Sequence, residues 1–167
     1  MYQLFKIFEG ITYFINTKLK ILYWKLKYGK RIKIGKNLKL RKNVIININK
    51  GGSLIIGDNN FFNNNCSINC HKRIEIGDNN LFGDAVKLYD HNHVFNDKSV
   101  NMKKTFNYGD IKIGNDNWIA SNVVILRNTE LQNNNVVAAG VVLNGKFDSD
   151  NVINIEKKIV TDKIIYK

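Results

Sequence analysis

The chain has 167 residues, of which 44% are hydrophobic, and this is the size and composition of one globular domain with its own core. No apolar run approaches the roughly 18 to 20 residues that span a bilayer. The net charge of +12 is concentrated at one end, because residues 1–50 hold 13 Lys/Arg and one acid, whereas residues 51–167 hold 13 of each sign. Without an RNP, zinc-finger or helix-turn-helix pattern, this basic end is a poor nucleic-acid signal, and we expect no nucleic-acid partner.

Residues 1–31 form a basic segment in which aromatic and aliphatic residues alternate with lysines. The spacing is compatible with one or two amphipathic helices. Two interpretations remain open at this point. The helical segment caps the domain, or residues 1–28 lie on an anionic membrane surface.

From residue 32 onward a six-residue period dominates the sequence. The aliphatic positions of its most regular stretch are Ile113, Ile119, Ile125, Leu131, Val137 and Leu143. The same step joins Ile56, Phe62, Ile68 and Ile74, and also Ile76, Phe82 and Leu88. An internal repeat of one aliphatic in six predicts an all-β fold, a parallel β-helix of hexapeptide coils over residues 32–160 with a tail at 161–167. Since the chain has no proline, Asn and Gly must form the corners, where both tolerate a left-handed backbone.

The period is interrupted once, over residues 89–109. This segment reads as a loop extruded from the prism, and it contains His91 and His93. Long loops inside regular arrays are usually functional. An imidazole can remove the proton of an alcohol near neutral pH, so this loop is the first place to look for a general base.

The repeats over residues 32–160, most clearly 113–143, resemble the hexapeptide-repeat acyltransferases. That resemblance implies a left-handed β-helix, acetyl-CoA as co-substrate and a homotrimer with active sites between prisms. The coil LFGDAVKLYDHNH is similar to that of the maltose- and galactoside-type sugar O-acetyltransferases. The match implies an enzyme in which His93 is the catalytic histidine and His91 the neighbouring candidate. Asn107 stands where the family has an acid, which leaves Asp90 or a backbone carbonyl to orient His93.

The same resemblance assigns the binding residues. Asn65, before Cys66, corresponds to the family's acceptor-binding Asn, with a plain corner residue as the alternative, and Asp90 is placed beside the acceptor. The residues implied on the CoA side are Trp118, Ala120, Ser121, Ala138, Ala139, Gly140, Asn144, Lys157 and Lys158. For Trp118 the alternative is packing within the coils, and for the two lysines it is a solvated face.

No metal site is expected. The Cys66-x3-Cys70-His71 pattern lacks the second ligand pair of a structural zinc site. The three histidines of the chain also lack the spacing of a zinc site that is built from three histidines of neighbouring coils. We expect the two cysteines to be buried small apolar residues. So few cysteines indicate a reducing compartment, which favours a location in the cytoplasm. If the N-terminus binds the membrane, the location is its inner face.

The function that the sequence favours is direct acetyl transfer from acetyl-CoA to a hydroxyl of a sugar or surface glycan precursor. The basic amphipathic start resembles extensions of acetyltransferases of surface polysaccharide assembly, which indicates capsule or lipopolysaccharide O-antigen as the setting. The alternative is a non-catalytic β-helix scaffold that binds an anionic membrane or a partner protein.

Overall fold

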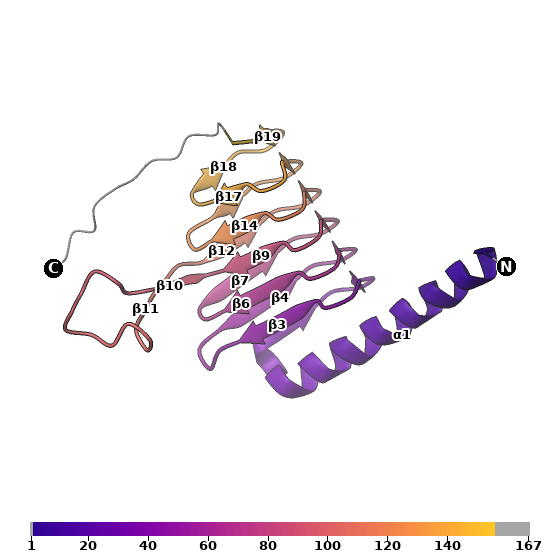
Figure 1. Ribbon diagram of the computed structural model, residues 1–167, viewed down its shortest axis with the longest axis horizontal. Coiled ribbons are helices and arrows are strands. Elements are labelled where there is room, and N and C mark those ends of the chain that lie inside the picture. Colours follow the sequence, from indigo (N-terminus) through magenta and orange to yellow (C-terminus); the bar gives the residue numbers. More distant parts are fainter. Residues whose placement is uncertain (1, 156–167) are drawn as a thin grey trace.

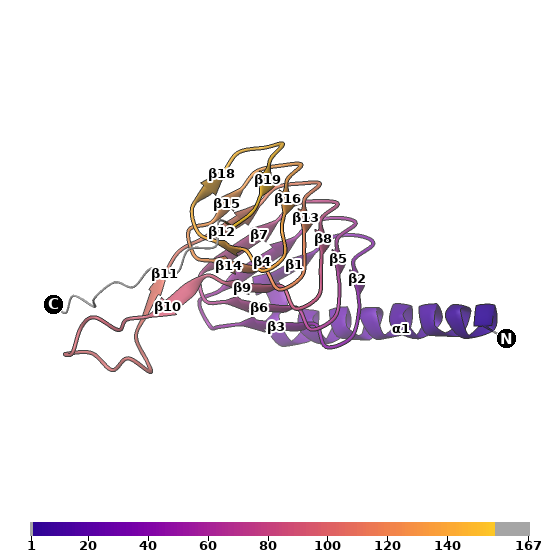
Figure 2. The ribbon, with the colours of Figure 1, turned by 45° about the horizontal axis from the view of Figure 1, so that its top comes forward.

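The computed structural model describes residues 2–155, with side chains from residue 10 onward. One long helix precedes a stack of parallel coils, and the coils form a triangular prism (Figure 1, Figure 2). The predicted parallel β-helix of hexapeptide repeats is therefore confirmed. No helix within residues 2–155 is both long and apolar enough to cross a bilayer.

Each face of the prism is one parallel sheet, to which successive coils add one short strand. Face A consists of β1 (Ile32–Ile34), β4 (Ser53–Ile56), β7 (Arg73–Ile76), β12 (Ile111–Ile113), β15 (Glu130–Leu131) and β18 (Lys146–Phe147). Face B consists of β2 (Lys39–Leu40), β5 (Phe61–Phe62), β8 (Leu81–Phe82), β13 (Trp118–Ile119), β16 (Val136–Val137) and β19 (Val152–Ile153). Face C consists of β3 (Ile45–Ile48), β6 (Ser67–Cys70), β9 (Lys87–Tyr89), β14 (Val124–Leu126) and β17 (Val142–Leu143). The chain turns from A to B to C in every coil, so the prism has an A–B, a B–C and a C–A corner.

The six-residue period is the inward-facing ladder of the prism. Ile113 pairs with Leu131 one coil later, which matches the expected coil of about 18 residues. All residues of the period are at most 4% exposed: Ile56, Phe62, Ile68, Ile74, Ile76, Phe82, Leu88, Ile113, Ile119, Ile125, Leu131, Val137 and Leu143. The rings of Phe62 and Phe82 stack at 4.2 Å between centroids. The core is thus one continuous column of apolar side chains.

Asparagine forms most of the corners, as the composition predicts. The non-glycine residues with positive φ are Asn37, Asn43, Asn59, Asn65, Asn79, Ala85, Asp116, Asn122, Asn128, Asn134 and Asp150. Their short polar side chains suit the left-handed region, and Ala85 is the apolar exception. A second set of asparagines is buried inside the A–B corner, where side-chain oxygens accept backbone N–H groups of the next coil: Asn60, Asn80, Asn117 and Asn135.

Helix α1 (Tyr2–Tyr28) and a 3-10 turn (Gly29–Arg31) cover the open end of the first coil. A terminal coil presents backbone groups that have no preceding coil to pair with. Polar side chains of α1 and the turn donate to the carbonyls of this coil: Thr17 to Leu40, Lys20 to Val44, Tyr28 to Ile46, and Arg31 to Ile48 and Asn49. The capping interpretation is confirmed, as one helix, and the membrane interpretation stays a prediction.

The interrupting segment is a hairpin, more ordered at its base than a plain loop. Strands β10 (His91–His93) and β11 (Phe106–Tyr108) pair antiparallel, with His93 opposite Phe106. The hairpin leaves the prism at the C–A corner that follows β9, and it projects on the side away from the free end of α1 (Figure 1). Its position places the two loop histidines directly after a strand of the rigid stack.

Candidate functional site

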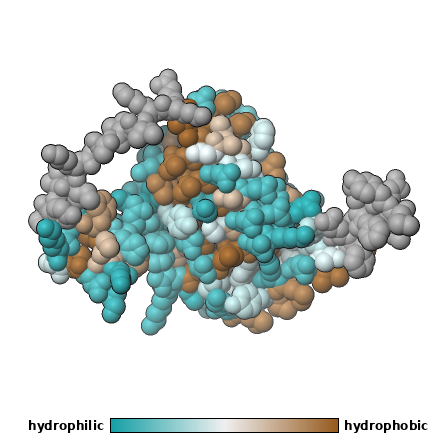
Figure 3. Space-filling view, viewed as in Figure 1, coloured by the Kyte–Doolittle hydropathy of each residue, from teal (hydrophilic) through white to brown (hydrophobic). Residues whose placement is uncertain are grey.

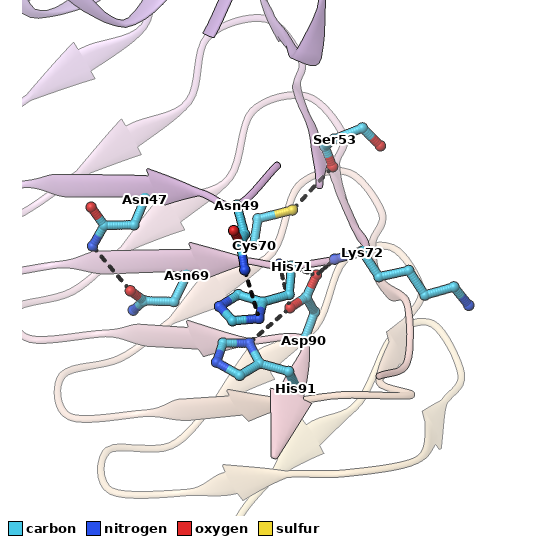
Figure 4. Close-up of polar contacts among 9 residues, drawn as sticks. All are labelled: Asn47, Asn49, Ser53, Asn69, Cys70, His71, Lys72, Asp90 and His91. Atoms are coloured by element: carbon cyan, nitrogen blue, oxygen red, sulfur yellow. Dashed lines mark hydrogen bonds and ion pairs between the residues drawn. The ribbon is translucent and has the colours of Figure 1, made fainter. Parts of the chain in front are cut away.

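The C–A corner beneath the hairpin is built around the Asp90 carboxylate, which is completely buried. Its oxygens accept the backbone N–H of His71 at 2.8 and 2.9 Å and that of Lys72 at 2.7 Å. Oδ1 also lies 3.0 Å from Nδ1 of His91 (Figure 4). A carboxylate is an acceptor on both oxygens, which suits this set of donors. Asp90 therefore fixes two coils to each other and sets the orientation of His91.

His71 and His91 come from neighbouring coils and stack face to face, with ring centroids 3.5 Å apart (Figure 4). Nδ1 of His71 lies 3.4 Å from the Asn49 amide nitrogen. Burial, followed by the field of His91, lowers the pKa of His71. The neutral imidazole is favoured at this position, chiefly because burial penalises the charged form.

His93 is the exposed histidine of the hairpin, and its ring is oriented by a backbone group. Nδ1 lies 2.7 Å from the carbonyl oxygen of Met102, across the hairpin. A carbonyl only accepts, so Nδ1 carries the proton and Nε2 of the neutral ring keeps a free lone pair. The Phe106 ring packs against the imidazole at 4.5 Å between centroids. His93 thus has the form that a general base needs.

The prediction that Asp90 contacts the acceptor is wrong for this conformation, since none of its side chain is exposed to solvent. Asp90 also contacts His91 rather than His93. Of the two alternatives for orienting His93, the structure selects the backbone carbonyl of Met102. Both His91 and His93 remain available as bases, but the His91 side chain is only 13% exposed.

The predicted site residues divide between two corners of the prism. The histidines lie at the C–A corner, whereas Asn65 lies at the B–C corner, before β6. Asn65 and His71 flank the two ends of β6, and six strand residues span roughly 20 Å. One chain does not bring its histidines and Asn65 together.

The corner role of Asn65 is directly visible. It has φ of +61° and its side-chain oxygen accepts the amide N–H of Asn43 at 3.1 Å. The same kind of contact recurs along the stack, for example between Asn47 and Asn69 (Figure 4). Asn65 is nevertheless exposed, so contact with an acceptor stays a prediction.

The residues implied for CoA are mostly small and stacked at the B–C corner. Ala120 and Ser121 follow β13, and the corner of the next coil continues with Ala138, Ala139 and Gly140. The Gly140 N–H donates to the Ser121 carbonyl at 3.0 Å, which joins the two corners. Gly140 has φ of +76°, and a Cβ added there would meet nothing within 4 Å. Small side chains over open backbone leave room for an extended pantetheine arm, so this corner fits the co-substrate.

The remaining CoA candidates lie elsewhere. Asn144 follows β17 at the C–A corner, on the histidine side of face C. Trp118 is on face B and is 51% exposed, so the alternative that it packs inside the coils is wrong. Lys157 and Lys158 lie outside the described residues.

His71 and Met102 are the site residues that sequence reasoning missed. The sequence pattern presents His71 only as a possible zinc ligand, although the pairing of Asn69 with Tyr89 places His71 one coil from His91. The signal that could have found this contact is the Ile-Gly-Asp-Asn motif, which occurs at Ile56 and again 20 residues later at Ile76. His71 and His91 are separated by the same 20 residues, so the motif spacing predicts that they occupy equivalent positions in neighbouring coils. The Met102 carbonyl carried no signal, because a backbone contact across a hairpin depends on the loop conformation.

The cysteines lie inside the prism rather than at this site. Both are at most 1% exposed and unpaired. Burial raises the pKa of Cys66 to about 11 and that of Cys70 to about 12. Among residues 2–155, no group of three or more His, Cys, Asp or Glu side chains could hold a metal ion.

Residues 110–145 match the family model described as bacterial transferase hexapeptide (six repeats). Over this stretch the chain therefore has the hexapeptide repeats of bacterial transferases. A hexapeptide-repeat acetyltransferase from Vibrio cholerae O1 biovar eltor, solved with acetyl-CoA, is 26% identical to this hexapeptide-repeat protein, with a TM-score of 0.62. The match covers 70% of the present chain and 62% of the Vibrio chain, so the protein spans less than two thirds of that relative.

Two further structures share the fold of this hexapeptide-repeat protein. A maltose O-acetyltransferase from Clostridium difficile 630 is 24% identical, with a TM-score of 0.64, and the match covers 74% of this chain and 66% of that one. AntD, an N-acyltransferase from Bacillus cereus solved with dTDP and coenzyme A, is 17% identical with a TM-score of 0.53, over 81% and 87% of the two chains.

Proposed function

We propose that this protein is an acetyl-CoA-dependent acetyltransferase whose acceptor is a hydroxyl of a sugar or surface glycan precursor. The observation that carries the proposal is the exposed His93 ring, held through Nδ1 by the Met102 carbonyl, so that Nε2 is free. The likeness to an acetyltransferase solved with acetyl-CoA supports the donor. The hydroxyl acceptor rests on the resemblance of the His93 coil to the sugar O-acetyltransferases.

The chemistry requires one base and one site for developing negative charge. Nε2 of His93 takes the acceptor hydroxyl proton while the oxygen attacks the thioester carbonyl. The tetrahedral oxyanion is stabilised by backbone N–H groups of the B–C corner or by the Ser121 hydroxyl. When the intermediate collapses, the carbon–sulfur bond breaks, and the CoA thiolate receives the proton from the His93 imidazolium. The products are an acetyl ester, free CoA and neutral His93.

The separation of the two corners leads us to propose that the active site lies between two copies of the chain in a homotrimer. Within one chain, His93 follows the end of β9, whereas the small-residue corner lies at the opposite edge of face C. A thioester held at that corner could not react with His93 of the same chain, because proton transfer needs hydrogen-bond distance. A cyclic trimer places the C–A corner of one prism against the B–C corner of its neighbour and completes the site.

The first test is calorimetric titration with CoA and acetyl-CoA, followed by an acceptor screen that measures thiol release. We expect saturable binding near one ligand per chain. His93→Ala should keep this binding and lose at least about a hundredfold in kcat, the usual contribution of a general base. His91→Ala is the matched control, and its kcat should fall less. Full activity of His93→Ala with its best acceptor would refute the assigned base, and failure to bind CoA at millimolar concentration would refute the enzyme.

Subunit complementation tests the shared site separately. His93→Ala lacks the base, and Ala139→Trp fills the exposed small-residue corner. Each should be inactive alone. If the site joins neighbouring chains, trimers reassembled from an equal mixture should regain about a quarter of wild-type activity, because one interface in four pairs an intact His93 with an intact corner. If both residues act within one chain, the mixture stays inactive and the shared-site proposal fails.

A further inference from the structure

Helix α1 has two apolar faces, and only one of them packs on the prism. The capping face carries Thr17, Trp24 and Tyr28, which are at most 6% exposed. The other face is an apolar stripe of residues that are each at least 50% exposed: Ile11, Phe14, Ile15, Leu19, Leu22, Tyr23 and Leu26. At about 100° per residue, the stripe centres opposite the capping face. Figure 3 shows hydrophobic residues along the lower side of this end of the molecule.

Lysines border the apolar stripe on both sides. Lys18 and Lys25 follow one edge and Lys27 follows the other, at the same 100° step. The Lys18 ammonium lies 5.3 Å from the Phe14 ring centroid, and that of Lys27 lies 5.4 Å from the Tyr23 centroid. The two ammonium groups therefore lie against aromatic rings at the edges of the stripe, and lysines beside an apolar helix face are typical of a helix at a membrane surface.

From residue 10 onward, α1 and the first coil carry positive charge alone. Every charged residue between positions 10 and 57 is Lys or Arg. A groove of about 780 Å³ where the helix leaves the first coil is lined by Lys18, Lys39 and Arg41, among others. A second groove, of about 660 Å³, includes Lys20, Arg41 and Lys42. An apolar face bordered by Lys and Arg is complementary to a binding partner that has an apolar interior and an anionic surface.

We infer that the apolar stripe of α1 docks the protein on an anionic lipid bilayer, with the helix lying in the interface. This goes beyond the proposed acetyl transfer and stands independently of it. Isologous pairing of two stripes is disfavoured, because it would bring the lysines of two copies together, and α1 has no acid from residue 10 onward to offset them. The apolar face supplies the burial and the flanking lysines attract the anionic headgroups.

Vesicle co-sedimentation with the full chain tests this inference. The probes are vesicles of phosphatidylcholine alone and vesicles with about one third phosphatidylglycerol. The wild type should bind the anionic vesicles, and the binding should weaken as salt increases. Leu22→Glu/Leu26→Glu should reduce binding at least about tenfold, as should Lys18→Gln/Lys25→Gln. The matched control is Val142→Glu/Val152→Glu, which replaces two exposed apolar residues of the solenoid and should bind as wild type does.

A spectroscopic readout keeps the test independent of folding. Leu22→Trp should show a blue-shifted emission when anionic vesicles are added, and Val142→Trp should not. Circular dichroism verifies that each variant keeps its fold. No binding of the wild type to anionic vesicles, or an equal loss in the Val142/Val152 control, would overturn the inference. Self-association that is abolished by Leu22→Glu/Leu26→Glu, without vesicle binding, would instead assign the stripe to a second copy.

Discussion

The imidazole ring of His71 lies flat against that of His91, one coil further along the chain, at 3.5 Å between centroids. The Asp90 carboxylate joins the same two residues, since it binds the backbone of His71 and the ring of His91. The rigid stack of coils thus extends to the base of the β10–β11 hairpin. Ring stacking, a buried carboxylate and a β-ladder together fix the position from which His93 projects.

The His71 stack should make the folded state sensitive to mild acid. Burial and the neighbouring His91 and His93 lower the pKa of His71, and Asp90 only partly offsets them. The unfolded chain then binds more protons as the pH falls below about 6.5, the ordinary histidine pKa. The stability contribution of neutral His71 is complete above that pH and is lost progressively below it. Denaturant unfolding between pH 7 and 5 should show a shallower pH dependence in His71→Gln than in the wild type, and equal slopes would contradict the assignment.

The asparagine ladder of the A–B corner makes a second prediction. The side-chain oxygen of Asn80 accepts both the backbone and amide N–H of Asn117 at 3.0 Å, and Asn117 accepts the N–H of Asn135 at 2.9 Å. All three are 1% exposed. Asn117→Ala leaves a buried N–H without its acceptor and should lower the free energy of unfolding by about 1–3 kcal/mol. Asn107→Ala, on the exposed side of the hairpin, is the control and should stay within about 0.5 kcal/mol of wild type.

The fold was predictable because its signals are local and repeated. A step of six from Ile113 to Leu143 admits one architecture, and every residue of the step is buried. The corners were predictable from asparagine, because its conformational preference acts within one residue. The pattern predicts a helical segment but leaves open whether it caps the domain, and whether α1 uses one face or two depends on which side meets the prism. Periodicity alone does not contain that information.

Candidate site residues could be predicted only where the family resemblance matched an individual residue of this chain. His93 could be placed in this way, but its orienting partner could not, because the Met102 carbonyl meets it through the closed hairpin. The resemblance places Asp90 beside the acceptor, whereas its buried carboxylate binds the backbone of the neighbouring coil and the ring of His91. The distribution of the predicted site residues over two corners follows from the order of faces A, B and C. The order of the faces is seen only in the folded structure, where the coils stack on one another.

The cysteine environment predicts unreactive thiols in the native protein. The Cys66 thiol donates to the Gly83 carbonyl at 3.1 Å, and that of Cys70 donates to the Ser53 carbonyl at 3.2 Å. With pKa values of about 11 and about 12, the thiolate is a trace species at pH 8. Mass spectrometry after native iodoacetamide treatment should therefore find neither cysteine alkylated on a time scale that modifies both in urea. Rapid native labelling of either residue would mean that the coils open there.

Among the described residues, Ala85 is the one apolar non-glycine residue with a positive φ, where other corners have Asn or Asp. This position offers a stabilising substitution. Its φ is +58°, whereas the equivalent corners have Asn43, Asn65 and Asn122 at +56°, +61° and +60°. An L-residue with a Cβ is disfavoured there by roughly 1–2 kcal/mol, and alanine has no polar group to compensate. Ala85→Gly removes that strain, but it also raises the conformational entropy of the unfolded chain, which lowers stability. The free energy of unfolding should therefore rise by a net amount of about 0.5–1 kcal/mol.

The matched control for Ala85 is the same substitution at Ala139, an exposed corner residue whose φ is not positive. There the added backbone freedom has no strain to relieve, and Ala139→Gly should lower the free energy of unfolding by about 0.4–1 kcal/mol. Urea unfolding of the two variants in parallel measures the difference, and the opposite signs are the diagnostic result. If Ala85→Gly destabilises the protein as Ala139→Gly does, packing of the Ala85 methyl group outweighs its backbone strain, and the corner tolerates an apolar residue for that reason.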